Sequence, residues 1–126
     1  MESDTINSAR PGAPPAWYNS HQRIDDRNLA MCRLIAEKML ADPSLLEVGI
    51  DNIRRWHAMH GETAPAHAEW LVLLAGPFDG VLDVLTSATE NATCLRSSHP
   101  FAGVVTQAER QVIFESYQAR TYHQSR

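Results

Sequence analysis

The chain has 126 residues, a formal net charge of -4 and an isoelectric point near 5.8. This length is typical of one domain, and such a chain buries about two thirds of its unfolded surface without metal or disulfide. The acidic balance disfavours broad nucleic-acid binding, which needs clustered cations. Lys38 is the one lysine among eleven basic residues, and the remaining guanidinium groups suit paired contacts with carboxylates.

Residues 1–19 predict a disordered N-terminal tail. They are rich in proline and small polar residues and contain hardly any large apolar side chain before Trp17, so they bury too little to offset the entropy of ordering. Trp17 and Tyr18 are the exception, and packing on the folded part is favoured over docking on a partner. The helical domain is expected over 20–122.

The cellular compartment is predicted to be the cytoplasm. The N-terminus has no signal-peptide pattern and no run of apolar residues reaches membrane-spanning length. Cys32 and Cys94 both fall in expected helices, and two cysteines in a domain of this size indicate buried free thiols rather than a disulfide framework.

The first expected helix starts with Asp25 as its N-cap, with Ile24 and Leu29 packing across its start. Apolar residues then recur at three- and four-residue spacing, which indicates a central helix. This face consists of Leu29, Cys32, Ala36, Met39 and Leu40. The helix should stop near Asp42 because the residue before Pro43 disfavours helical backbone.

The second expected helix uses Asp42 as its N-cap and ends at Gly61. The third runs through "APAHAEWLVLLAG", the fourth begins after Asp79, and the fifth follows the capping-box pair of Ser87 and Glu90. The inward residues expected on these four helices are Leu46, Ile50, Ile53, Trp56, Trp70, Leu71, Leu74, Val81, Leu82, Leu85, Ala92, Cys94 and Leu95.

A last helix is predicted by a second capping box, Thr106 with Glu109. Its apolar members are Val112, Ile113, Phe114 and Tyr117. The fold class is therefore all-α, a single-domain bundle of five or six short helices behind a flexible arm.

The connector within "LRSSHPFAGVVTQAER" is predicted to carry its own anchor. Pro100 blocks continuation of the fifth helix, Gly103 permits a positive backbone angle, and Phe101 between them should plug the core. The preceding serines, Ser97 and Ser98, are expected to bond the free carbonyls at the end of the fifth helix.

This connector, with "EKMLADPSLLEVGIDNIRRW" and a later "EW", resembles small helical bacterial proteins that are antitoxin partners of nucleotidyltransferase-type toxins. The resemblance covers residues 28–117. The motif positions that fit are Leu95, Arg96, Ser98, Pro100, Phe101 and Gly103, whereas His99 stands where a second serine is expected.

The resemblance implies a non-catalytic module that binds a protein partner, possibly a toxin encoded by the adjacent gene. No cofactor and no metal are expected. Arg54, Arg96 and Arg110 are candidates for buried or interfacial ion pairs. The full set of candidate partner-binding residues is Arg54, Arg55, Arg96, Ser98 and Arg110.

Two other function classes stay open. A metal-binding enzyme is suggested by the histidines His57, His60 and His67 with Glu62 and Glu69, although the helical motifs typical of such sites are absent from the sequence. The simpler interpretation of these histidines is a solvated helix end, where protonated imidazoles interact favourably with the negative end of the helix dipole.

A DNA-binding regulator would use the basic cluster of Arg54, Arg55, His57 and His60. This cluster shares its helix with Glu47 and Asp51, which favours a solvated or partner-facing surface. Nucleophilic catalysis by the Ser-Ser-His run at 97–99 is not expected, since adjacent residues rarely place a base beside a hydroxyl.

Overall fold

Residues 20–118, which this computed structural model describes, form six α-helices and one short 3-10 helix, without a β-strand. The elements are α1 (Ser20–Ala41), η1 (Pro43–Leu45), α2 (Leu46–His60), α3 (Pro65–Ala75), α4 (Phe78–Thr86), α5 (Glu90–Arg96) and α6 (Gln107–Ser116). The all-α prediction is thus confirmed. The tail predicted over 1–19, with Trp17 and Tyr18, lies outside the described residues.

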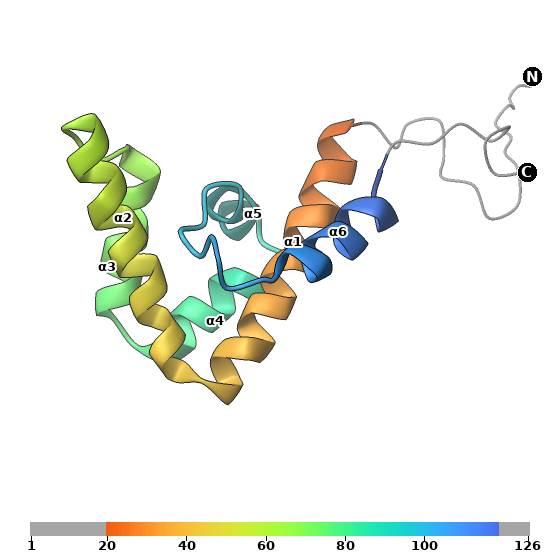
Figure 1. Ribbon diagram of the computed structural model, residues 1–126, viewed down its shortest axis with the longest axis horizontal. Helices are drawn as coiled ribbons and strands as arrows, with labels where there is room; N and C mark the ends of the chain where they lie inside the picture. Colours follow the sequence, from red (N-terminus) through yellow and green to blue (C-terminus); the bar gives the residue numbers. More distant parts are fainter. Residues whose placement is uncertain (1–19, 119–126) are drawn as a thin grey trace, which may run out of the picture.

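The helices form an open V (Figure 1). Its two limbs are α1 and α2, and η1 lies at the vertex. The helix α3 packs along α2, α6 packs along α1, and α4 packs against α1 and α5, while α5 lies between the limbs. Among the described helices none is both long and apolar enough to span a bilayer.

The core lies where α1, α4 and α5 meet the loop after α5. Trp70 and Phe101 are its largest fully buried side chains, and their rings pack edge to face with centroids 5.6 Å apart. The indole N–H of Trp70 donates to the carbonyl of Leu95, which satisfies its polar atom inside the core. The other buried apolar residues include Cys32, Ile35, Met39, Ile53, Val81 and Leu85.

Several predicted helix ends are confirmed. Gly61 ends α2 with a φ of 76°, and Thr106 forms the full capping box with Glu109 at the start of α6. Asp42 accepts a hydrogen bond from the backbone N–H of Ser44 as predicted for a cap, but it caps η1 and not α2, which begins at Leu46. Gly103 has a positive φ of 97°, as its place in the connector predicts.

Other predicted helix starts were wrong. The helix α1 begins at Ser20, so Asp25 and Ile24 lie inside it and do not cap it. The helix α4 begins at Phe78 rather than after Asp79. The hydroxyl that caps α5 belongs to Thr89, because its side chain and not that of Ser87 accepts from Ala92 N–H.

Three burial predictions were also wrong, and one of them is Leu40, which was expected on the apolar face of the first helix but is 64% exposed. Cys32 is a buried thiol as expected, but Cys94 is exposed. Val112, expected on the apolar face of α6, is 63% exposed, while Ile113 and Phe114 carry the contact with the core. The short helix α6 covers only part of α1, so its apolar residues do not all find a partner there.

Candidate functional site

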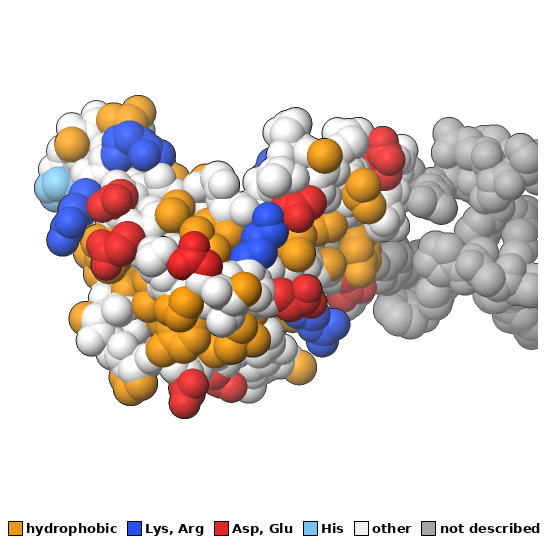
Figure 2. All heavy atoms as spheres, turned by 60° about the horizontal axis from the view of Figure 1, so that its bottom comes forward, with side chains coloured by type: hydrophobic (Ala, Val, Ile, Leu, Met, Phe, Trp, Pro, Cys, Tyr) orange, Lys and Arg blue, Asp and Glu red, His pale blue; other side chains and the backbone are white. Residues whose placement is uncertain are grey.

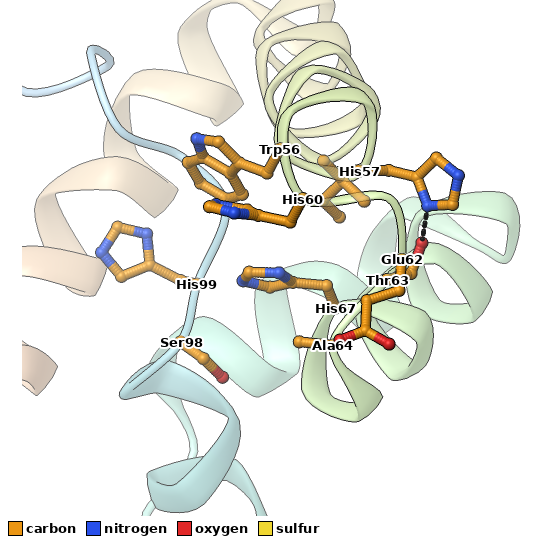
Figure 3. Close-up of a pocket in the computed structure, with 10 residues that line it drawn as sticks. Trp56, His57, His60, Glu62, Thr63, Ala64, His67, Ser98 and His99 are labelled. Atoms are coloured by element: carbon orange, nitrogen blue, oxygen red, sulfur yellow. Dashed lines mark hydrogen bonds between the residues drawn. The ribbon is translucent and has the colours of Figure 1, made fainter.

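An open pocket of about 650 Å³ lies between the second half of α2, the start of α3 and the segment after α5. Its volume is within the range typical of ligand pockets. Figure 3 shows side chains from all three segments turned toward it. The lining residues are Ile53, Trp56, His57, His60, Glu62, Thr63, Ala64, His67, Ser98 and His99.

A tight helical hairpin builds one wall of the pocket. Gly61 adopts the left-handed backbone that ends α2, and its N–H donates to the carbonyl of His57. Pro65 opens α3 at the first helical position, where no amide hydrogen is needed. The short turn therefore brings the imidazoles at the end of α2 beside His67 on α3.

The aromatic rings of this wall lie close together. The centroids of Trp56 and His67 are 5.0 Å apart with the ring planes 31° from parallel. In Figure 3 the rings of His60 and His67 point toward the pocket, whereas His57 points away toward Thr63. His57 Nδ1 and Thr63 Oγ1 are 2.8 Å apart. Within residues 20–118 the side chains of His60 and His67 make no hydrogen bond.

His99 stands opposite this wall and is neutral. Its Nδ1 accepts a hydrogen bond from the backbone N–H of Phe101, so the neutral ring carries its proton on Nε2. Burial, together with the positive charge of Arg110, lowers the pKa of His99 from 6.5 to about 4. The ring also lies nearly parallel to that of Phe101.

The segment carrying His99 is fixed by the predicted plug and by one residue that sequence reasoning missed. Pro100 and Phe101 are both buried, which confirms the plug. The side-chain amide of Asn52 donates to the carbonyls of Pro100 and Ala102 at 2.8 and 3.0 Å. The sequence did contain a signal for Asn52, because it is a polar residue beside the apolar face of α2. Its amide oxygen accepts from Arg55 Nη2, which links this arginine to the loop.

Arg96 acts inside the fold. It is 2% exposed, and its guanidinium donates to the carbonyls of Val84 and Ser87 and to Thr93 Oγ1. Within the described residues it has no carboxylate partner, so the expected ion pair is not formed there. The positive charge instead lies at the carbonyl end of α4, where the helix dipole is negative.

The other candidate partner-binding residues lie in three places. Arg54 and Arg55 are exposed on α2, and Arg54 is 3.9 Å from Asp51. Ser98 lines the pocket and donates to the carbonyl of Leu95 at 3.4 Å, while Ser97 donates to that of Cys94, as predicted for these serines. Arg110 is exposed on α6, with its guanidinium over the ring of Phe114.

The side chains with catalytic or metal-binding chemistry do not form a recognisable centre. Within residues 20–118 no three side chains from His, Cys, Asp and Glu lie where they could hold one metal ion. Burial raises the pKa of the Cys32 thiol to about 12, although Arg96 lowers it in part. The thiol is therefore protonated and not a nucleophile.

Comparisons with known proteins found no matching family model, no similar curated protein and no similar solved structure. The resemblance to antitoxin partners of nucleotidyltransferase-type toxins therefore stays a prediction.

Proposed function

We propose that this chain is a non-catalytic protein-binding module that acts in the cytoplasm as an antitoxin-like neutraliser of a co-encoded toxin by direct binding. The antitoxin role rests on the sequence motif around Phe101. The binding role is supported by the surface of the second half of α2, where several residue types that dominate interfaces are exposed beside the pocket.

This surface contains Arg54, Arg55, Trp56 and Met59. Met59 is 67% exposed although it is a large apolar residue, Trp56 is half-buried at the pocket, and both arginines are exposed. Arginine, tryptophan and methionine are enriched at protein interfaces, and tryptophan and arginine provide much of the binding energy there. These four residues lie within 54–59, and this concentration of interface-type residues in one stretch of α2 is the observation that carries the proposal.

The guanidinium of Arg54 is available to a partner. Its contact with Asp51 is 3.9 Å long and both side chains are mostly exposed, 75% and 67%, and such a surface pair adds little stability. A partner carboxylate can therefore replace Asp51 at small cost.

The charge distribution gives less support to the alternative of a DNA-binding regulator. On the face drawn in Figure 2, the described residues place Asp and Glu side chains between the Lys and Arg side chains, without a continuous basic stripe. Binding to the phosphate backbone requires such a stripe.

The test is co-expression of this chain with the product of the neighbouring gene. The neighbour alone should arrest growth, co-expression should relieve the arrest, and the two proteins should co-purify at a fixed stoichiometry. Combined substitution Arg54→Ala and Met59→Ala should reduce co-purification at least about tenfold, as expected for interface anchors. Arg33→Ala, at an exposed position of α1, is the matched control and should leave binding unchanged.

A harmless neighbour that does not co-purify would refute the antitoxin proposal. Retention of the chain on operator DNA from its own promoter, lost in the α2 variant and strongly weakened by salt, would favour the regulator instead.

A further inference from the structure

The lining of the pocket differs in composition from the chain as a whole. The full chain is acidic, yet the lining contains four histidines and a single carboxylate, Glu62. Arg55 lies on α2 and donates to Asn52, which in turn donates to the loop carbonyl of Ala102. The pocket therefore offers a negatively charged group several imidazoles and only one carboxylate.

The pocket also has an aromatic wall. Trp56 is only half-buried, and His67 lies against it with the ring centroids 5.0 Å apart. Ile53 adds an apolar surface at the base. A volume of about 650 Å³ exceeds that of any single side chain, so the pocket has room for a ring together with the residues on either side of it.

Two imidazoles are available to bind an anion. His60 and His67 make no hydrogen bond within residues 20–118, whereas His57 is engaged by Thr63 and His99 by the backbone of Phe101. Each imidazole has a ring N–H that can donate a hydrogen bond to a carboxylate.

Resting on the proposed protein-binding function, we infer that this pocket receives a partner segment in which an aromatic residue is flanked by acidic residues. The ring stacks on Trp56 beside His67, and the carboxylates accept hydrogen bonds from His60 and His67. The acidic groups that oppose this binding are Glu62 on the lining and Glu69, which is exposed on α3. Arg55, which lies outside the lining and donates to Asn52, is a positive charge that favours an acidic segment.

The experiment uses the full chain and defined peptides, with affinity measured by calorimetry and the imidazole signals followed by NMR. The probe is a capped peptide Gly-Asp-Trp-Glu-Gly, and its controls are Gly-Asn-Trp-Gln-Gly and Gly-Asp-Ala-Glu-Gly. The acidic aromatic peptide should bind at least about tenfold more tightly than either control.

Variants locate the binding. The double substitution His60→Gln and His67→Gln keeps polar side chains but removes both rings, and it should weaken the acidic aromatic peptide toward the affinity of the amide control. Trp56→Leu should weaken the acidic aromatic peptide toward the affinity of the alanine control. His57→Gln is the matched control, because this histidine lines the same pocket but faces Thr63. Circular dichroism confirms that every variant is folded.

Equal binding of the acidic and amide peptides, a lack of saturable binding at millimolar peptide, or an equal loss in His57→Gln would overturn the inference. NMR shifts caused by inorganic phosphate but not by the peptide would also overturn it. The proposed function fails separately. If the neighbouring gene product co-purifies with the histidine double variant as well as with the wild type, the function stands and the pocket assignment falls.

Discussion

The contact between Gly49 and Phe101 predicts that one substitution changes sign with its background. Gly49 lies buried in α2, and a Cβ added there would come within 2.7 Å of Phe101 Cε1. The ring cannot easily withdraw, because Phe101 is 1% exposed and packs edge to face on Trp70. Gly49→Ala should therefore overpack the core.

The expected magnitude follows from two opposing effects. Overpacking a core costs about 1 to 3 kcal/mol, whereas alanine gains about 1 kcal/mol over glycine inside a helix. Gly49→Ala should thus lower the free energy of unfolding by up to about 2 kcal/mol. Phe101→Leu removes the ring edge and leaves room for the new methyl group, so in that background Gly49→Ala should stabilise by about 0.5 to 1 kcal/mol.

The assay is a double-mutant cycle in urea, followed by far-UV circular dichroism and extrapolated to water. Gly80→Ala in α4 is the control, since a Cβ there meets nothing within 4 Å, and it should stabilise in both backgrounds. Phe101→Ala alone should cost about 3 to 5 kcal/mol, a large share of the stability of a small domain. Equal effects of Gly49→Ala in the two backgrounds would refute this account of the core.

Three further predictions follow from polar contacts of the fold. Arg96→Ala should cost about 3 kcal/mol or more in a urea melt, because charged hydrogen bonds to buried carbonyls are lost, and a melt like that of the wild type would disprove the capping role. His99 has a folded-state pKa of about 4 against an ordinary 6.5, so as the pH falls the unfolded chain takes up the proton first. The free energy of unfolding should then drop by up to about 1.4 kcal/mol per pH unit below about pH 6.5. His99→Asn, which keeps an acceptor for Phe101 N–H, should remove this slope between about pH 6.5 and 5, and an unchanged slope would contradict the assignment. Hydrogen bonds from Lys38 and from the backbone N–H of Thr106 lower the pKa of Glu109. Lys38→Met removes the first of these bonds and should raise that pKa. An NMR titration of that carboxyl checks this, and an unmoved pKa would show that the contact is not formed in solution.

Local signals in the sequence were sufficient to predict the fold class and several helix ends. A proline after Asp42, a glycine at Gly61 and the pair Thr106 with Glu109 act within one turn of backbone, so they need no distant partner. The plug at Phe101 was predictable for a similar reason. A large apolar residue between a proline and a glycine has no place in a solvated loop and must be buried.

Tertiary contacts decided where α1 begins and what Arg96 does. The first turn of α1 lies beside the end of α6, where Arg23 Nη1 donates to the carbonyl of Tyr117, 94 positions away in the chain. An N-cap rule based on Asp25 does not include that contact. Arg96 likewise meets carbonyls presented by another helix, which no spacing within the chain reveals.

The candidate site was predicted only in part from the sequence. The density of histidines at 57–67 was visible, but it suggested metal ligands, because spacing along one helix does not show which way each ring points. The fold turns His57 toward Thr63, places His67 against Trp56 and brings His99 from the far end of α5 to face them. The sequence thus determined which histidines the chain has near this turn. The turn at Gly61 and the Asn52 contacts to the loop determined which of them share one pocket, because only packing places residues distant in the chain side by side.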